Sequence, residues 1–375
     1  EVEEIKAFTL SNVRGTVQAD QLKEAMGQNT LVFNLDTSLR MMGDVAEFYV
    51  NNSIRNHYFV SISGYHIAEA GANPITQAAL TLANGLTYVE LFKARGLNPD
   101  KFLRNFSWFF SNGMDPEYVV IGRVARRIWS IAMREMYNVG ERGQKLKYHI
   151  QSSGRSLHAQ EYTWNDYRTT LQALYALADN ANSLHTNSRD EAFGTPTEET
   201  VRDAVAIQLI LSKEYGLLQN ENPLQGSHIT TWLTENVEGQ ILKIFEEMNR
   251  RGGVLGSLEV NYQRNRIQDE SMIYEHRKHT GDIPIIGVNT FQDPDSKSLS
   301  ADEADSFDLD VTRSDGDEKR MVILRNEDFR KRHAKEAEMG IERLKNTARE
   351  GGNLFEVMMD IVEYCTVGQV TEALF

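Results

Sequence analysis

The chain has 375 residues and a mass of 42.7 kDa, enough for one large domain with an extension or for two ordinary domains. Its 41% hydrophobic and 25% charged residues predict a folded protein. A single cysteine, Cys365, excludes a disulfide framework and a cysteine-based metal site, and it fits a reducing cytoplasm, where we expect the protein to work. The net charge of -14 and the lack of a long apolar run disfavour nucleic-acid and membrane binding.

Short runs of β-branched or aromatic residues alternate along the chain with longer amphipathic stretches. The runs that predict strands are Val13–Ala19, Phe59–Gly64, Phe106–Phe110, Lys147–Ser152 and Asn182–Asn187, with a later one near Leu217–Asn222. The stretches that predict helices are Pro74–Arg95, Pro116–Tyr137, Thr163–Asp179, Thr197–Gly216, Ile229–Arg251 and Leu258–Lys278. From Phe59 onward, successive strands begin roughly 35–50 residues apart, which is typical of strand–helix units in a parallel sheet. The sequence therefore predicts an α/β fold, either a barrel or a doubly wound sheet, and the lack of a Gly-x-Gly-x-x-Gly or Walker A motif disfavours a doubly wound nucleotide-binding domain.

Negative charge is concentrated in one segment. Residues 292–318 contain ten Asp or Glu and two Lys or Arg, a net charge of -8. Such a stretch, poor in apolar residues, is typical of a solvated linker. We therefore expect a substrate-binding α/β portion over residues 1–291, an acidic linker over 292–320 and a helical region over 321–375.

The C-terminal region is predicted to be helical. Mixed charges over Glu327–Arg349 indicate an exposed helix, and Thr366–Phe375 has the length of a last short helix. Leu354–Tyr364 is strongly apolar and must pack on a surface. Docking on the same domain and pairing with a second subunit are both consistent with the sequence.

Polar side chains gather where the predicted strands end. They are Thr16 and Gln18, then Tyr65 and His66, then His149 and Gln151, then Ser183, His185 and Asn187. The carboxyl ends of barrel strands open on one face, where active sites lie. Local capping would explain one such cluster, but four in succession favour a site. The groups are mostly neutral, which indicates binding and orientation with a cofactor carrying the difficult step.

Metal coordination by this chain is not predicted. His276 and His279 lie on a basic stretch, and nothing nearby supplies the further ligands that a metal site needs. A nucleophile elbow, an HExxH motif and a Ser-x-x-Lys motif are all absent from the sequence.

Several segments, in the same order, resemble the acyl-CoA mutases that depend on adenosylcobalamin. SISGYHIAEAGA (Ser61–Ala72) is similar to their SISGYHxxEAGA segment, and GTVQAD (Gly15–Asp20) is similar to their GTxQND strand. FSWFFSNGM, HIQSSGRSL, SLHTNSRDEAFGTPT and GVNTF are similar to later segments of the same family. The resemblance runs from about Gly15 to Phe291, and it is strongest to the barrel portion of the fused isobutyryl-CoA mutases.

The resemblance implies a (β/α)8 TIM barrel, of which this chain supplies about the last six strands, followed by a C-terminal helical extension. Gly15–Asp20 would be the third strand and Phe59–Gly64 the fourth, so the first two strands would lie before Glu1. It also implies an adenosylcobalamin cofactor, an acyl-CoA substrate, a homodimer, and a cobalamin-binding domain and a GTPase domain in a longer polypeptide or a partner chain. The Asp-x-His-x-x-Gly motif that supplies the cobalt ligand is absent from these 375 residues, so we expect another segment to supply it.

Site residues follow from the resemblance position by position. His66 matches the histidine that hydrogen-bonds the thioester carbonyl, and Tyr65 matches the tyrosine beside the adenosyl group. The other matches are adenosyl contacts (Gln151, Glu191), a CoA contact (Ser107) and substrate-pocket residues (Thr16, Gln18, His149, Ser183). The CoA phosphates need cations, and the candidates are Arg14, Arg142 and Lys147, with Tyr58 as a neighbour. Surface charge explains these cations equally well.

Gln28 departs from the pattern of methylmalonyl-CoA mutase, where the matching arginine pairs with the free carboxylate of the substrate. A neutral amide would lose a charge-assisted interaction of about 1.5–3 kcal/mol. We therefore expect an uncharged acyl group and a radical rearrangement of isobutyryl-CoA to butyryl-CoA. Open alternatives are a 2-hydroxyisobutyryl-CoA or methylmalonyl-CoA mutase, a non-catalytic barrel subunit, and a metal-free barrel lyase.

Overall fold

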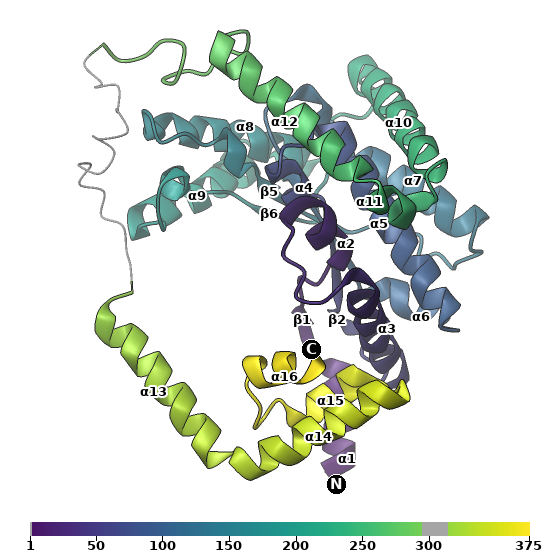
Figure 1. Cartoon of the computed structure of the whole chain (residues 1–375). Helices are drawn as coiled ribbons and strands as arrows, with labels where there is room; N and C mark the ends of the chain where they lie inside the picture. Colours follow the sequence, from purple (N-terminus) through teal and green to yellow (C-terminus); the bar gives the residue numbers. More distant parts are fainter. Residues whose placement is uncertain (1, 295–313) are drawn as a thin grey trace.

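The computed structural model describes residues 2–294 and 314–375 (Figure 1). The described chain is an α/β protein that is mostly helical, with short parallel strands. The strands are β1 (Arg14–Thr16), β2 (Asn56–Tyr58), β3 (Val60–Ser63), β4 (Phe106–Asn112), β5 (Tyr148–Ser152) and β6 (Ser183–His185).

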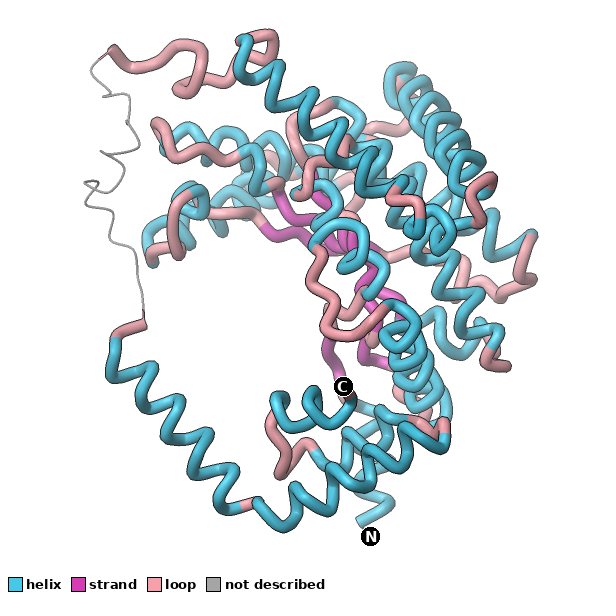
Figure 2. The backbone as a smooth tube through the Cα atoms, in the orientation of Figure 1, coloured by secondary structure: helices cyan, strands magenta, loops and turns pink. Residues whose placement is uncertain are grey.

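The strands follow one another in chain order, and every pair is parallel. β1 pairs with β2, while β3, β4, β5 and β6 form a second ladder in that order. β2 and β3 are two parts of one extended segment that is interrupted at Phe59. The N–H of Ser61 in β3 donates to the Ala19 carbonyl at 3.1 Å, so the segment that contains β1 pairs with β3 as well as with β2. Figure 2 shows the strands gathered at the centre of the molecule. Their carboxyl ends therefore face the same way, as the sequence predicts.

The strand predicted near Leu217–Asn222 is wrong. Gly216 has φ +70°, and Leu217–Gln219 forms a single 3₁₀ turn, η8, in which the Gln219 N–H donates to the Gly216 carbonyl. A left-handed residue followed by this closed turn prevents an extended run. In the GVNTF segment the structure has one isolated bridge, Ile286 to Thr290, and no named strand.

The helices predicted before the linker agree with the structure to within a few residues, except that three are subdivided. The helices before the linker are α1 (Val2–Asn12), α2 (Gln21–Lys23), α3 (Leu35–Asn51), α4 (Tyr65–Glu69), α5 (Pro74–Ala94), α6 (Pro99–Phe102), α7 (Ile121–Glu135), α8 (Asn165–Ala178), α9 (Glu198–Leu209), α10 (His228–Asn249), α11 (Gly253–Glu259) and α12 (Tyr262–Thr280). Asn261, in the left-handed region at φ +56°, separates α11 from α12 and divides the predicted helix Leu258–Lys278. A 3₁₀ turn, η3 (Pro116–Val119), precedes α7 and divides the predicted helix Pro116–Tyr137. A π-helix, η7 (Ile210–Glu214), follows α9 and divides the predicted helix Thr197–Gly216. The structure also has two longer helices that were not predicted, α1 and α3.

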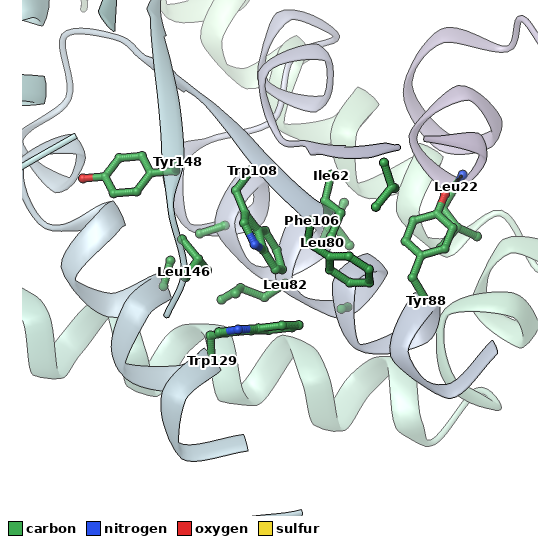
Figure 3. Packing of buried hydrophobic residues seen from close by; sticks show 14 of the residues in the cluster. Leu22, Ile62, Leu80, Leu82, Tyr88, Phe106, Trp108, Trp129, Leu146 and Tyr148 are labelled. Carbon is green, nitrogen blue, oxygen red and sulfur yellow. Dashed lines mark hydrogen bonds between the residues drawn. The ribbon is translucent and has the colours of Figure 1, made fainter. Parts of the chain in front are cut away.

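The core lies between the sheet and the helices on one of its faces. α5 and α8 pack on the strands, and α7 and α10 pack on α5 as a further layer. Trp108 of β4 and Trp129 of α7 meet edge to face with ring centroids 4.7 Å apart (Figure 3). Gly85 of α5 faces them, and a Cβ there would overlap the Trp108 ring. Close helix–sheet packing therefore fixes the strands that carry the site.

The C-terminal helices are α13 (Gly316–Arg332), α14 (Ala334–Glu350), α15 (Leu354–Ile361) and α16 (Val367–Leu374). The helix predicted over Glu327–Arg349 is divided at His333, which lies between α13 and α14. α13 begins inside the segment expected to be a linker, and residues 295–313 of that segment lie outside the described residues. In the part of the chain that the structure describes, no helix is both long and apolar enough to cross a bilayer.

The apolar segment Leu354–Tyr364 docks on its own chain, which is one of the two arrangements that the sequence allows. Phe355 packs edge to face on Phe48 of α3 at 5.2 Å. The Leu354 N–H donates to the buried Asp44 carboxylate at 3.0 Å, and Arg95 pairs with the same carboxylate at 2.7 Å. Apolar packing and a buried carboxylate therefore hold α15 on α3.

Candidate functional site

A cavity of about 330 Å³ lies against the strands and gathers many of the predicted residues. Its lining includes Thr16, Gln18, Tyr58, Ser107, Lys147, His149 and Ser183 from the predicted set, together with Ser61, Phe109, Tyr148 and Asn182. These predicted residues lie in or beside five separate strands, β1, β2, β4, β5 and β6, and the structure brings them to one concave surface.

Strand register explains why these side chains meet. Phe109 of β4 is paired with His149 of β5, which is paired with Ser183 of β6. Residues paired across parallel strands point to the same face of the sheet. His149 Nδ1 lies 2.8 Å from Ser183 Oγ, and burial lowers the pKa of His149, with His185 contributing.

Tyr65 and His66 begin α4 directly after β3, at the carboxyl edge of the sheet. Tyr65 stacks on Phe109 with ring centroids 4.8 Å apart and an interplanar angle of 3°. His66 meets the same ring edge-on at 5.9 Å, and His149 lies 5.2 Å from it. Phe109, which the sequence analysis did not single out, therefore connects the predicted catalytic pair with the cavity.

The electrostatic surroundings keep both predicted catalytic side chains neutral. Burial, with the Lys23 charge, lowers the pKa of His66 from 6.5 to about 4, although Glu24 acts in the opposite direction. Burial raises the pKa of Tyr65, and Glu69 and Glu191 add to that shift. At neutral pH the site therefore offers an uncharged imidazole and an uncharged phenol.

Gln28 lies at the end of a π-helix, η1 (Glu24–Gln28), that continues α2. Lys23 is only 4% exposed, and its ammonium donates to Gln28 Oε1 at 2.8 Å and to Glu24 Oε1 at 2.5 Å. The i→i+5 turn of a π-helix brings residues five apart onto one face, which an α-helix does not do. The sequence did not predict this contact of Lys23, because residues five apart do not lie on the same face of an α-helix and Lys23 was therefore not expected to contact Gln28.

Of the predicted adenosyl contacts, Gln151 lies near the carboxyl end of β5 and Glu191 lies beyond the carboxyl end of β6. Gln151 Nε2 donates to Asn187 Oδ1 at 3.0 Å, and Glu191 lies 4.0 Å from His185 Nε2. Asn187, whose side chain also donates to the Ser152 carbonyl at 2.9 Å, holds Gln151 in place. A hydrogen-bonded amide and a partly exposed carboxylate suit the hydroxyl and amino groups of an adenosyl moiety.

Glu69 is a further buried carboxylate at this edge. It accepts from Ser153 Oγ at 3.1 Å and from the N–H groups of Gly154 and Arg155 at 3.1 and 2.9 Å. Burial raises its pKa, and these donors oppose the rise. Glu69 thus ties α4, which carries Tyr65 and His66, to the end of β5.

Two predicted cations, Arg14 and Arg142, do not line the cavity and are exposed. Arg142 and Arg55 both lie near Arg104, because burial and these two neighbouring charges lower the pKa of Arg104. Arg55 and Arg104 precede β2 and β4, so this group lies toward the amino ends of the strands. It is a concentration of positive charge that the sequence analysis recognised only at Arg142.

A larger cavity of about 900 Å³ lies beside α12 and is lined mostly by residues outside the predicted set. Arg155 lines it, stacked over the Tyr274 ring at 4.8 Å and 3.6 Å from Glu275.

The residues present fit the adenosyl part of a cobalamin cofactor. Gln151, Glu191 and Tyr65 offer hydrogen-bonding groups and a planar ring near one another. Among the described residues, no group of three His, Cys, Asp or Glu side chains could hold a metal ion.

Residues 1–375 match the sequence profile of the methylmalonyl-CoA mutase family, and the chain belongs to this family. It is 59% identical over 375 residues to the fused isobutyryl-CoA mutase of Geobacillus kaustophilus, covering 100% of this chain and 34% of that protein. It is 37% identical over 290 residues to the 2-hydroxyisobutanoyl-CoA mutase large subunit of Aquincola tertiaricarbonis, covering 77% of this chain and 51% of that subunit.

The methylmalonyl-CoA mutase of Escherichia coli is 31% identical over 380 residues, covering 99% of this chain and 51% of that enzyme. The chain thus spans about a third of the length of the fused relatives and about half of the others. The resemblance stated from the motifs is confirmed at the level of the family.

Proposed function

We propose that this chain is the substrate-binding part of an adenosylcobalamin-dependent mutase that interconverts isobutyryl-CoA and butyryl-CoA. The observation that carries the proposal is the cavity beside Phe109, which gathers the predicted pocket residues next to Tyr65 and His66. The high identity to fused isobutyryl-CoA mutases supports the choice of substrate.

The fold part of the proposal is a (β/α)8 barrel of which this chain forms one portion. Consecutive parallel strands with helices between them support it, and within the described residues β1 and β6 each have one neighbour. Further strands would pair with these two edges. A cobalamin-binding domain and a GTPase domain, in the same polypeptide or a partner chain, and a homodimer complete the proposal.

CoA would enter along the sheet with its phosphates at the amino ends of the strands. Arg142, with Arg55 and Arg104, offers cations there, and Ser107 and Lys147 line the cavity further in. Arg104 Nε is buried without a hydrogen-bond partner among the described residues, which suits an anion. The acyl end would then lie near His66 and Gln28.

In the reaction, one hydrogen atom and the thioester group exchange places on adjacent carbons, so atoms and electrons balance. When bound, adenosylcobalamin supplies the carbon radical that abstracts hydrogen. His66 would hold the thioester oxygen with a hydrogen bond, Tyr65 and Phe109 would exclude water, and Gln151 and Glu191 would hold the adenosyl hydroxyls. Gln28, being neutral, cannot pair with an acyl carboxylate, and the neighbouring Lys23 ammonium is already paired with Glu24.

The test is turnover by the complete polypeptide with adenosylcobalamin. We expect butyryl-CoA to form from isobutyryl-CoA, detected by chromatography, with slower turnover of methylmalonyl-CoA and 2-hydroxyisobutyryl-CoA. Preference for either of those substrates would contradict the assignment. Absence of cobalamin spectral changes on mixing would favour a non-catalytic subunit or a lyase instead.

A further inference from the structure

Ser63 ends β3 and is held from behind by a buried network. Its side chain is 1% exposed, and its N–H donates to Asp20 Oδ2 at 3.0 Å. Asp20 is fully buried, and its other oxygen accepts from the Tyr88 hydroxyl at 2.7 Å and the Lys23 N–H at 3.2 Å. These bonds fix the Ser63 backbone, and therefore the origin of its side chain.

The Ser63 hydroxyl lies 2.6 Å from His66 Nδ1. A buried hydroxyl group lowers stability unless it donates its proton to an acceptor. Among the described residues, the acceptor that the Ser63 hydroxyl reaches is His66 Nδ1. A ring nitrogen that accepts a hydrogen bond carries no proton, so in the neutral ring the proton is on Nε2. Burial and the nearby Lys23 charge, which lower the pKa of His66, keep the ring neutral.

We propose that Ser63 is a positioning residue that selects the Nε2–H tautomer of His66. The inference rests on the proposed function, in which that Nε2–H would donate to the thioester oxygen. In the opposite tautomer Nε2 would be an acceptor and would repel that oxygen, while the buried Ser63 proton would lack its acceptor. The Ser63 hydroxyl thus determines whether the imidazole can donate a hydrogen bond to the thioester oxygen, although Ser63 itself does not contact the substrate.

The first test reads the tautomer directly by nitrogen NMR of the complete polypeptide labelled with ¹⁵N-histidine. His66→Gln identifies the signal by removing it. We expect the unsubstituted protein to carry the proton on Nε2, and Ser63→Ala to show a second tautomer. The control is Ser257→Ala, because Ser257 of α11 is equally buried and donates to the Met248 carbonyl of α10. A proton on Nδ1 in the unsubstituted protein, or an unchanged signal in Ser63→Ala, would overturn the proposal.

The second test measures kcat and KM of the complete enzyme with isobutyryl-CoA. We expect Ser63→Ala to lower kcat about 10-fold with little change in KM, and Ser63→Thr, which keeps a hydroxyl, to recover part of the loss. A thermal melt of each variant identifies a loss that comes from unfolding. An unchanged kcat in a variant whose tautomer has shifted would overturn the role of Ser63. The expected tautomer together with no turnover in the unsubstituted enzyme would instead contradict the proposed function.

Discussion

His66 has three features that suit a hydrogen-bond donor to a substrate. It is neutral, its Nδ1 is occupied, and it contacts the ring that lines the cavity. We expect His66→Ala to reduce kcat about 10²–10³-fold, because one donor to a developing oxyanion is lost, with little effect on binding of the CoA ester. Stopped-assay kinetics and calorimetry of CoA-ester binding measure the two effects, and exposed His276→Ala is the control. Equal losses in binding and turnover would mark His66 as structural.

Gln28 allows a test of substrate choice. An arginine at this position would place a cation beside Lys23, whose ammonium already pairs with Glu24. We expect Gln28→Arg to abolish most isobutyryl-CoA turnover, because a methyl group cannot pair with the added charge, and to strengthen competitive inhibition by methylmalonyl-CoA. Gln28→Met, which removes the Lys23 hydrogen bond without adding charge, is the matched control. Unchanged isobutyryl-CoA kinetics with no gain in diacid binding would show that Gln28 lies outside the acyl pocket.

The sequence predicts the site residues that have distinctive neighbours and misses those that act through geometry. Tyr65 and His66 belong to a long motif, so they are found by pattern. Phe109 looks like any core aromatic in a strand, and Lys23 next to Glu24 looks like a solvated pair. Ser63 lies inside the same motif as His66, and its three-residue spacing from the histidine was a signal available in the sequence.

At the scale of elements, the contact between α15 and α3 depends on one carboxylate. Asp44 accepts from the Leu354 N–H and pairs with Arg95, so Asp44→Ala leaves both groups without their buried partner. We expect a loss of about 1–3 kcal/mol in the free energy of unfolding and faster hydrogen exchange over Leu354–Ile361. Asp36→Ala, at an exposed position in the first turn of α3, is the control. Unchanged exchange in α15 would mean that apolar packing alone holds it.

The helices predicted in the α/β portion from Pro74 onward are found in the structure because they are long and their apolar residues recur at helical spacing, whereas α1 and α3 were not predicted. The other errors are local. Leu217–Asn222 has the composition of a strand, but Gly216 turns the chain into a 3₁₀ turn. Left-handed Asn261 divides one predicted helix, and a break at His333 divides another. Such breaks depend on the backbone angles of single residues. The spacing of apolar residues, which is a property of a whole segment, does not report these angles.

For the whole molecule, histidines whose pKa is lowered by burial make the free energy of unfolding depend on pH. His66 and His158 have pKa values lowered by burial from 6.5 to about 4, so between these values the unfolded chain binds more protons than the folded one. We expect the contribution of these two neutral histidines to the free energy of unfolding to be complete above pH 6.5 and to be lost as the pH falls toward 4. Buried carboxyl groups with raised pKa values, such as Asp20 and Glu69, act in the opposite direction, so a variant is needed to isolate the effect.

His158→Gln should weaken the fall in the free energy of unfolding between pH 6.5 and pH 4, because it removes one of the histidines whose pKa is lowered by burial. Urea denaturation at several pH values measures this, and the exposed His279→Gln is the control. If the unsubstituted protein and both variants had the same pH dependence, this prediction would be wrong.

The parallel α/β architecture and its strand order could be predicted from the sequence. The docking of the C-terminal helices could not, because an apolar helix does not encode which surface it covers.

The docking of α15 on α3 also has a consequence for synthesis on the ribosome. Leu354 bonds to a residue 310 positions earlier in the chain. At roughly 5–20 residues per second, the surface of α3 that α15 covers waits about 15–60 s after emerging before its partner is made. Arg95 emerges much sooner and can pair with Asp44 during this interval, but the apolar Phe48 surface stays uncovered. Nascent chains stalled before Leu354 should therefore be the form that molecular chaperones bind at this surface.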